Sequence, residues 1–295
     1  FVFPFRADLE PEQRGSLAER LLGLPLTTVL FLKHLESVVV EIDQAGRSER
    51  REWTVRREVV DGDRWVAVPG LGGSGLYRVT VSSTDDDQAA FYIAHDANVP
   101  IGSNRVGLNG PAWEGVDLTE VSIAALADGP GEEMPESWRH FHVFLPTEER
   151  CPYPMLVNGA FATDLSRQQV RVRPERGDYN SHLVREAARL FVDEMLPVLR
   201  RDGLERVLAA LDRGEDPSGG AAAELLHACL VDALAEKPLL PTELGDEKPL
   251  AACVLPSSLV EAEGELFRSV LGEVARWGEA EFPAAQFCRG RWARV

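Results

Sequence analysis

Apolar residues change their spacing near Arg173, and this change divides the predicted secondary structure into two parts. Before it, short stretches that are β-branched or alternate between apolar and polar residues favour strands. After it, Leu183, Ala187 and Leu190 recur at the three- and four-residue spacing of an amphipathic helix. The predicted strands are residues 1–5, 29–32, 37–42, 52–60, 64–68, 76–82, 89–95, 119–126 and 140–145.

Turn and capping residues set the ends of several predicted elements. Asp61 and Gly62 form a strong two-residue turn signal, which predicts a hairpin between the strands on either side. Pro11 fits the first turn of a helix over residues 9–22, and Pro197 is expected to end or bend the helix that contains Leu183. The other predicted helices are residues 204–211, 221–234 and 261–277.

These elements predict an α+β fold, with a mostly antiparallel sheet, packed helices and a helical C-terminal region. The chain has 295 residues, which suits one large domain or two ordinary ones. The predicted division is a sheet-rich domain over residues 1–177 and a mainly helical region over residues 178–295.

Composition and charge narrow the classes of function. The chain has 31 Lys and Arg against 48 Asp and Glu, a formal charge of −17, which argues against a basic nucleic-acid platform. The apolar stretch near residues 28–40 is interrupted by Lys33, His34 and Glu36, so a membrane span is not expected. The 4 cysteines form no Cys-x-x-Cys pair, which favours a reducing, cytoplasmic setting over a zinc cage or a disulfide framework.

Two sets of residues suggest independent hydrolytic chemistry, and each has a plainer interpretation. His140 and His142 would share one face of a strand and could ligate a metal, but no third ligand follows from the spacing, which favours a half-exposed strand. Ser166 lacks the Gly-x-Ser-x-Gly surroundings of a nucleophile elbow. A hydrolase built on either set remains an alternative.

Residues 145–170 form the most informative stretch. Asn158 and Gly159 predict a turn after a short strand, and capping side chains at residues 163–166 precede Arg167. A loop of this kind would project Arg167 outward, where its permanently charged guanidinium suits the oxygens of a transferring phosphoryl group. A salt bridge between Arg167 and one of the 48 acidic residues is the alternative.

Several motifs, found in the same order, resemble sacsin-like members of the GHKL ATPase superfamily (gyrase, heat-shock protein 90 chaperones, histidine kinases and MutL). Phe-Val-Phe-Pro-Phe-Arg at 1–6 is similar to the strand that closes their nucleotide-binding domain, and residues 28–35 are similar to the strand that follows it. Phe-Leu-Pro-Thr at 144–147 and Val-Asn-Gly-Ala-Phe-Ala at 157–162 resemble a strand and an Asn-Gly-x-Phe turn. Leu-Ser-Arg-Gln at 165–168 resembles the loop that follows this turn.

The resemblance implies a transducer, or middle-domain, fold and a role in ATP turnover. In the chaperone branch an arginine of the Leu-Ser-Arg loop contacts the terminal phosphate of ATP, and the matching residue here is Arg167. Ser166 and Gln168 then become nucleotide-contacting residues. The implied partners are an upstream ATPase domain, a protein client and a second copy in a homodimer.

The adenine-pocket and catalytic motifs of these ATPases are absent from the sequence, as is an initiator methionine. We therefore expect the chain to be part of a longer polypeptide whose upstream domain holds ATP and magnesium. On this hypothesis the chain alone would not be an enzyme, whereas the parent protein would be an ATPase. The alternative is a non-catalytic interaction scaffold that keeps the family architecture.

Overall fold

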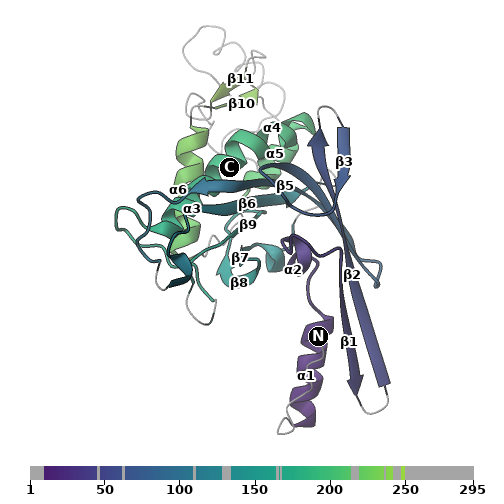
Figure 1. The fold of residues 1–295 in the computed structure, drawn as a ribbon. Helices are drawn as coiled ribbons and strands as arrows, with labels where there is room; N and C mark the ends of the chain where they lie inside the picture. The colour runs from purple at the N-terminus through teal and green to yellow at the C-terminus, as the bar shows by residue number, and fades with distance from the viewer. Residues whose placement is uncertain are drawn as a thin grey trace, which may run out of the picture.

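The structure is a computed structural model that describes residues 10–44, 47–61, 64–108, 111–127, 134–163, 166, 168–213, 219–235, 237–241 and 247–249. It confirms the predicted α+β class: a nine-stranded sheet carries helices on its faces (Figure 1). All strand pairs in this sheet are antiparallel except one, β7 with β9. The predicted strand over 1–5 and the predicted helix over 261–277 lie outside the described residues.

The strands follow one another across the sheet in the order β1-β2-β4-β5-β6-β9-β7-β8, and β3 also pairs with β2. The predicted hairpin at Asp61 is confirmed, because Asp61 of β2 pairs with Arg64 of β3. A separate two-stranded sheet lies later in the chain. The bounds are β1 Ser37–Gln44, β2 Arg47–Asp61, β3 Arg64–Val68, β4 Gly75–Ser83, β5 Gln88–Pro100, β6 Leu118–Leu126, β7 His140–Val143, β8 Leu145–Arg150, β9 Leu156–Gly159, β10 Pro238–Pro241 and β11 Glu247–Pro249.

Helices precede the sheet and follow it in the sequence, and short 3-10 turns lie at Pro111–Trp113 and Glu136–Trp138. The predicted helices over 204–211 and 221–234 are confirmed with the same bounds. Pro197 lies in the first turn of α4. The five residues that precede α4 form a π-helix, which joins it to α3. The bounds are α1 Pro11–Leu22, α2 Thr27–Leu30, α3 Tyr179–Leu190, the π-helix Phe191–Met195, α4 Leu196–Arg201, α5 Leu204–Leu211 and α6 Ala221–Leu234.

Both faces of the sheet are buried against other elements. On one face Ile123, Phe141 and Val157 pack with Leu183 of α3 and Leu226 of α6. The other face packs with α2 and the residues around it. Since burial of apolar surface is the main favourable term in folding, these two cores account for the position of the helices. The boundary between two domains at residue 177 stays a prediction. Among the described residues, the core that contains Ile123 and Leu183 includes side chains from both sides of this boundary.

The strand predicted over residues 29–32, which the resemblance extends to 28–35, is wrong, because Thr27–Leu30 forms a short helix. A helical turn brings Leu26, Val29 and Leu30 to the same side, and all three are buried against the sheet. Burial of these side chains overrides the strand preference of the β-branched residues in this segment.

The turn predicted at Asn158 and Gly159 is also wrong, because both residues lie inside β9. Asn158 pairs with Ser122 of β6, and Gly159 pairs with Val121. A Cβ atom at Gly159 would lie 3.2 Å from the ring of Phe161 and 3.4 Å from the carbonyl oxygen of Glu120. Gly159 therefore allows Phe161 and the backbone of Glu120 to pack close to the strand, and it is not part of a turn.

The chain reversal comes earlier, within the strand predicted over residues 140–145. Val143 of β7 pairs with Leu145 of β8, so Phe144 alone connects two antiparallel strands. Phe144 has a φ of 63°, a left-handed conformation that is uncommon for a bulky residue. The expected single strand is therefore two short ones.

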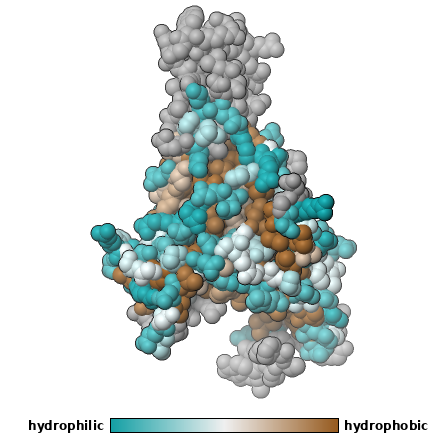
Figure 2. Space-filling model, turned by 45° about the horizontal axis from the view of Figure 1, so that its top comes forward, coloured by the Kyte–Doolittle hydropathy of each residue, from teal (hydrophilic) through white to brown (hydrophobic). Residues whose placement is uncertain are grey.

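On the face of the molecule drawn in Figure 2, hydrophilic residues are interspersed with hydrophobic ones. Exposed large apolar residues come from separate elements, such as Leu118 of β6, Leu145 of β8 and Val231 of α6. Among the described helices, none combines the length and the apolar character needed to cross a membrane.

The packing around β9 predicts that Gly159→Ala destabilises the protein. The added methyl group must displace Phe161 or the neighbouring backbone, so we expect the free energy of unfolding to fall by about 1–3 kcal/mol in urea denaturation. Gly72→Ala is the control, because a Cβ atom at Gly72 would meet no atom within 4 Å. Equal effects of the two substitutions would contradict this account of Gly159.

Candidate functional site

The loop between β9 and α3 contains the residues that the sequence predicted for the site. Thr163 and Val170 form an antiparallel bridge that closes this loop, and Ser166 and Gln168 are exposed between them. Asp164, Leu165 and Arg167 lie outside the described residues. We refer to residues 163–170 as the bridge loop.

The bridge loop is attached to the sheet through Glu148, an exposed residue of β8. The backbone N–H of Glu148 donates to the carbonyl oxygen of Gln168 at 3.0 Å, and the side-chain amide of Gln168 donates to Glu148 Oε1 at 3.2 Å. The hydroxyl of Ser166 donates to Gln168 Oε1 at 3.3 Å. The two predicted contact residues therefore hydrogen-bond to each other and share one anchor.

Asn180, in the first turn of α3, binds both ends of the bridge loop. Its Oδ1 accepts from the backbone N–H of Ala162 at 2.8 Å, while its Nδ2 donates to the carbonyl oxygens of Ala162 at 2.7 Å and Arg171 at 2.9 Å. The side chain is buried, with 3% of the residue exposed. Sequence reasoning missed Asn180, because a polar residue just after a helix start suggests only a local cap.

The residues on either side of Asn180 also fix the start of α3. Asp178 caps the helix by accepting from the backbone N–H of Ser181 at 2.9 Å, and it accepts from the hydroxyl of Ser181 at 2.8 Å. The hydroxyl of Tyr179 bonds to Thr119 at 2.7 Å and donates to the carbonyl oxygen of Ala160 at 3.2 Å. The helix start is thereby tied to β6, to the end of β9 and to the bridge loop.

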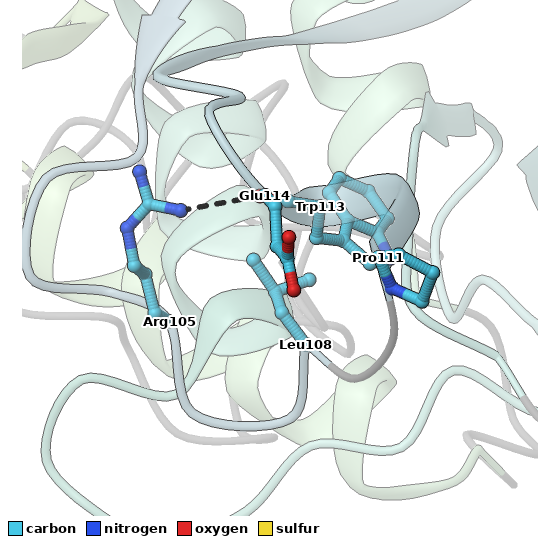
Figure 3. Close-up of a pocket in the computed structure, with 5 residues that line it drawn as sticks. All are labelled: Arg105, Leu108, Pro111, Trp113 and Glu114. Atoms are coloured by element: carbon cyan, nitrogen blue, oxygen red, sulfur yellow. Dashed lines mark hydrogen bonds between the residues drawn. The ribbon is translucent and has the colours of Figure 1, made fainter.

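A pocket of 390 Å³ lies beside this helix start and is lined by Arg105, Leu108, Pro111, Trp113 and Glu114 (Figure 3). The ring of Trp113 packs edge-on against Tyr179, with 5.2 Å between ring centroids. Arg105 is already engaged, because its guanidinium donates to Asp117 and to the carbonyl oxygen of Val116, each at 2.9 Å. The pocket thus offers no uncommitted arginine to an anion.

A row of four buried polar residues crosses the face of the sheet that packs against α2. Strand pairing aligns His95 of β5 with Ser122 of β6, Ser122 with Asn158 of β9, and Asn158 with His142 of β7. Each is at most 1% exposed, and paired residues project from the same face. We call these four residues the polar row.

Hydrogen bonds satisfy part of the polar row. His95 Nδ1 and the hydroxyl of Ser122 share a hydrogen bond of 2.9 Å, and Asn158 Oδ1 accepts from the backbone N–H of Phe144 at 2.9 Å. Neither ring nitrogen of His142 has a partner in the described part of the chain, and its ring packs edge-on against Phe31 at 5.0 Å. Asn158 therefore supports the left-handed residue that joins β7 to β8.

Burial keeps both histidines of the polar row neutral. It lowers the pKa of His142 to about 3, with a smaller effect from the charge of His140. It also lowers the pKa of His95 to about 4, and the charge of Lys33 acts in the same direction. Lys33 forms an ion pair with Glu120, beside the row.

These positions bear on the hydrolase alternative. His142 is fully buried, so the half-exposed strand predicted for it is wrong: a covering layer around Phe31 buries the face that was expected to be open. Ser166 lies on the exposed bridge loop, where its hydroxyl donates to Gln168 Oε1. No group of three or more His, Cys, Asp or Glu residues that could hold a metal occurs among the described residues.

Comparison with known proteins adds no relative: no family model, no curated protein and no solved structure matches the chain. The geometry of the bridge loop and the sequence motifs are therefore the basis for a functional proposal.

The polar row predicts a loss of stability in mild acid. The pKa values of His95 and His142 lie below the 6.5 of an unfolded histidine, so between pH 6.5 and about 4 the unfolded chain binds more protons. The free energy of unfolding should therefore fall as the pH falls through this range, by about 1.4 kcal/mol per pH unit for each histidine.

Urea denaturation between pH 7 and pH 4.5 tests this expectation. His142→Phe removes one titrating group at similar volume, and the pH dependence should become shallower. A slope that is the same in the wild type and His142→Phe would show that His142 does not carry the effect.

Proposed function

We propose that this chain is the transducer, or middle, segment of a sacsin-like GHKL ATPase in the cytoplasm. In this proposal an upstream domain binds and hydrolyses ATP, and the bridge loop couples both events to a conformational change. Arg167 contacts the terminal phosphate, with Ser166 and Gln168 beside it. The observation that carries the proposal is the exposure of Ser166 and Gln168, two residues of the Leu-Ser-Arg-Gln sequence motif, next to segments that are held by the buried start of a helix.

The side chains of the loop fit a phosphate ligand. The hydroxyl of Ser166 and the amide of Gln168 are exposed, and in this proposal they exchange their present bonds to Gln168 and Glu148 for bonds to the phosphate. A guanidinium at Arg167 would add a permanent charge in a planar fork. Charge develops on the phosphoryl oxygens during transfer, so a cation placed there lowers the barrier. When bound to the upstream domain, ATP and magnesium supply the phosphoryl group and its metal.

A transducer also needs a connection from the loop to the rest of the fold. The bridge loop is joined to β8 through Glu148 and to α3 through Asn180. A displacement of the loop would therefore shift its contacts with β8 and with α3 at the same time. Such a change is a two-state equilibrium that the nucleotide biases by binding one state more tightly.

The partners in this proposal are the upstream ATPase domain, a second copy in a homodimer and a protein client. The competing proposal is an interaction scaffold that keeps the architecture but has lost the coupling to ATP. The two differ in whether Arg167 contributes to turnover, so they can be separated by one substitution.

We predict that Arg167→Ala impairs ATP turnover in the polypeptide extended at its N-terminus to include the upstream domain. The kcat should fall at least about ten-fold, or about 1.4 kcal/mol of transition-state stabilisation, while the affinity for ATP changes little. Steady-state kinetics and a nucleotide titration give the two quantities.

Arg176→Ala is the matched control, since Arg176 is an exposed arginine outside the bridge loop. It should leave kcat unchanged. Unchanged turnover in Arg167→Ala would remove the phosphate contact from this loop and favour the scaffold.

A further inference from the structure

The side-chain amide of Asn180 hydrogen-bonds to the two residues that flank the bridge loop, Ala162 and Arg171. Its single oxygen accepts from one end, at Ala162, and its nitrogen donates to both ends, at Ala162 and Arg171. An asparagine amide has two N–H donors and an oxygen that can accept two bonds, so both donors are used here and the oxygen accepts from Ala162. Because the residue is buried, water does not compete readily for these bonds.

These bonds bring together two points of the backbone that are separated in the sequence by the whole bridge loop. The bridge between Thr163 and Val170 lies directly inside them. Closing a flexible segment costs conformational entropy, and contacts at its base offset that cost. The hydrogen bonds of Asn180 and the bridge between Thr163 and Val170 therefore both hold the two ends of the bridge loop together.

Few other side chains could replace this amide. Aspartate keeps an acceptor for the N–H of Ala162 but has no donor for the two carbonyl oxygens when it is ionised. Leucine has a similar size and offers neither. In both cases buried carbonyl groups lose their partners, which is unfavourable in a site that excludes water.

Asn180 belongs to α3, and that helix links the bridge loop to the rest of the molecule. The helix packs against β5 and β6, and it continues through the π-helix Phe191–Met195 into α4. Single π-helical turns within α-helices occur often at functional sites. A side chain at the helix start that holds both ends of the loop is thus placed to relate the state of the loop to this helical unit.

We propose that Asn180 is a positioning residue, which closes the base of the bridge loop and couples the position of the loop to α3. The assignment rests on the proposed function for its effect on ATP turnover, whereas the closure of the loop can be measured without it. Asn180 does not contact the nucleotide in this proposal; it acts by holding the segments on either side of the bridge loop.

Amide hydrogen exchange on the 295-residue chain tests the closure. The decisive reporter is the N–H of Glu148, which donates to the carbonyl oxygen of Gln168 but does not contact Asn180. In Asn180→Leu we expect the protection of this amide to fall at least ten-fold, together with that of Ala162. Amides in the centre of β5 and β6 should keep their protection.

Two further variants separate closure of the loop from a general weakening of the helix. Asp178→Ala removes the cap of α3 but leaves the bonds of Asn180, so the amide of Glu148 should keep most of its protection. Asn180→Asp would place a buried carboxylate against the carbonyl oxygens of Ala162 and Arg171, so we expect a loss at least as large as in Asn180→Leu. If Asn180→Leu does not fold, Asn180→Ala, which removes the amide without adding bulk or charge, provides the same comparison with Asp178→Ala.

Unchanged protection of Glu148 in the folded Asn180 variants would overturn the proposal, as would an equal loss in Asp178→Ala. In the extended polypeptide, Asn180→Leu should lower kcat at least ten-fold and leave the KM for ATP unchanged. If Glu148 loses protection but neither Asn180→Leu nor Arg167→Ala affects turnover, the closure by Asn180 stands and the proposed ATPase role fails.

Discussion

The buried start of α3 imposes a constraint that much of the neighbouring structure has to meet. Asp178, Tyr179, Asn180 and Ser181 are all nearly inaccessible to solvent, and each carries polar atoms that need a partner. Those partners come from β6, from the residues after β9 and from the segment that leads into the helix. Satisfying one helix terminus therefore determines the path of the chain after it leaves β9.

The two faces of the sheet meet the demand for buried polar partners in different ways. On the α3 face the polar groups cluster at the helix end, and the strands contribute mainly apolar residues. On the α2 face a row of polar side chains runs across the middle of the sheet, where Phe31 packs edge-on against His142 and Tyr77 of β4 packs edge-on against His95. Neutral histidines tolerate this environment better than charged groups do, which agrees with the lowered pKa values of His95 and His142.

The sequence was a good guide wherever the local pattern and the tertiary environment agree. The strands over 76–82, 89–95 and 119–126 were predictable because their periodicity matches a sheet with buried faces. The errors arose where burial overrides local preference. Residues 27–30 form a helix despite their β-branched residues, and Asn158 and Gly159 lie in a strand despite their turn chemistry.

In the candidate site, too, features set by the local sequence could be predicted and features set by tertiary packing could not. The exposure of Ser166 and Gln168 agrees with a loop read from the sequence, whereas the contacts of Asn180 with Ala162 and Arg171 depend on how distant segments pack. No local motif distinguishes an asparagine that closes a loop from one that only begins a helix. The same is true of Glu148, whose partner Gln168 is twenty residues away.

The one-residue connection between β7 and β8 limits how this region can change its length. Along β8 the buried side chains of Thr147 and Glu149 alternate with the exposed side chain of Glu148. Since successive residues of a strand point to opposite faces, inserting or deleting one residue at Phe144 would exchange these orientations. Glu148 and Arg150 would then take the buried positions of Thr147 and Glu149, and Glu148 would turn away from the bridge loop. Natural variation in length should therefore be confined to other loops of the sheet.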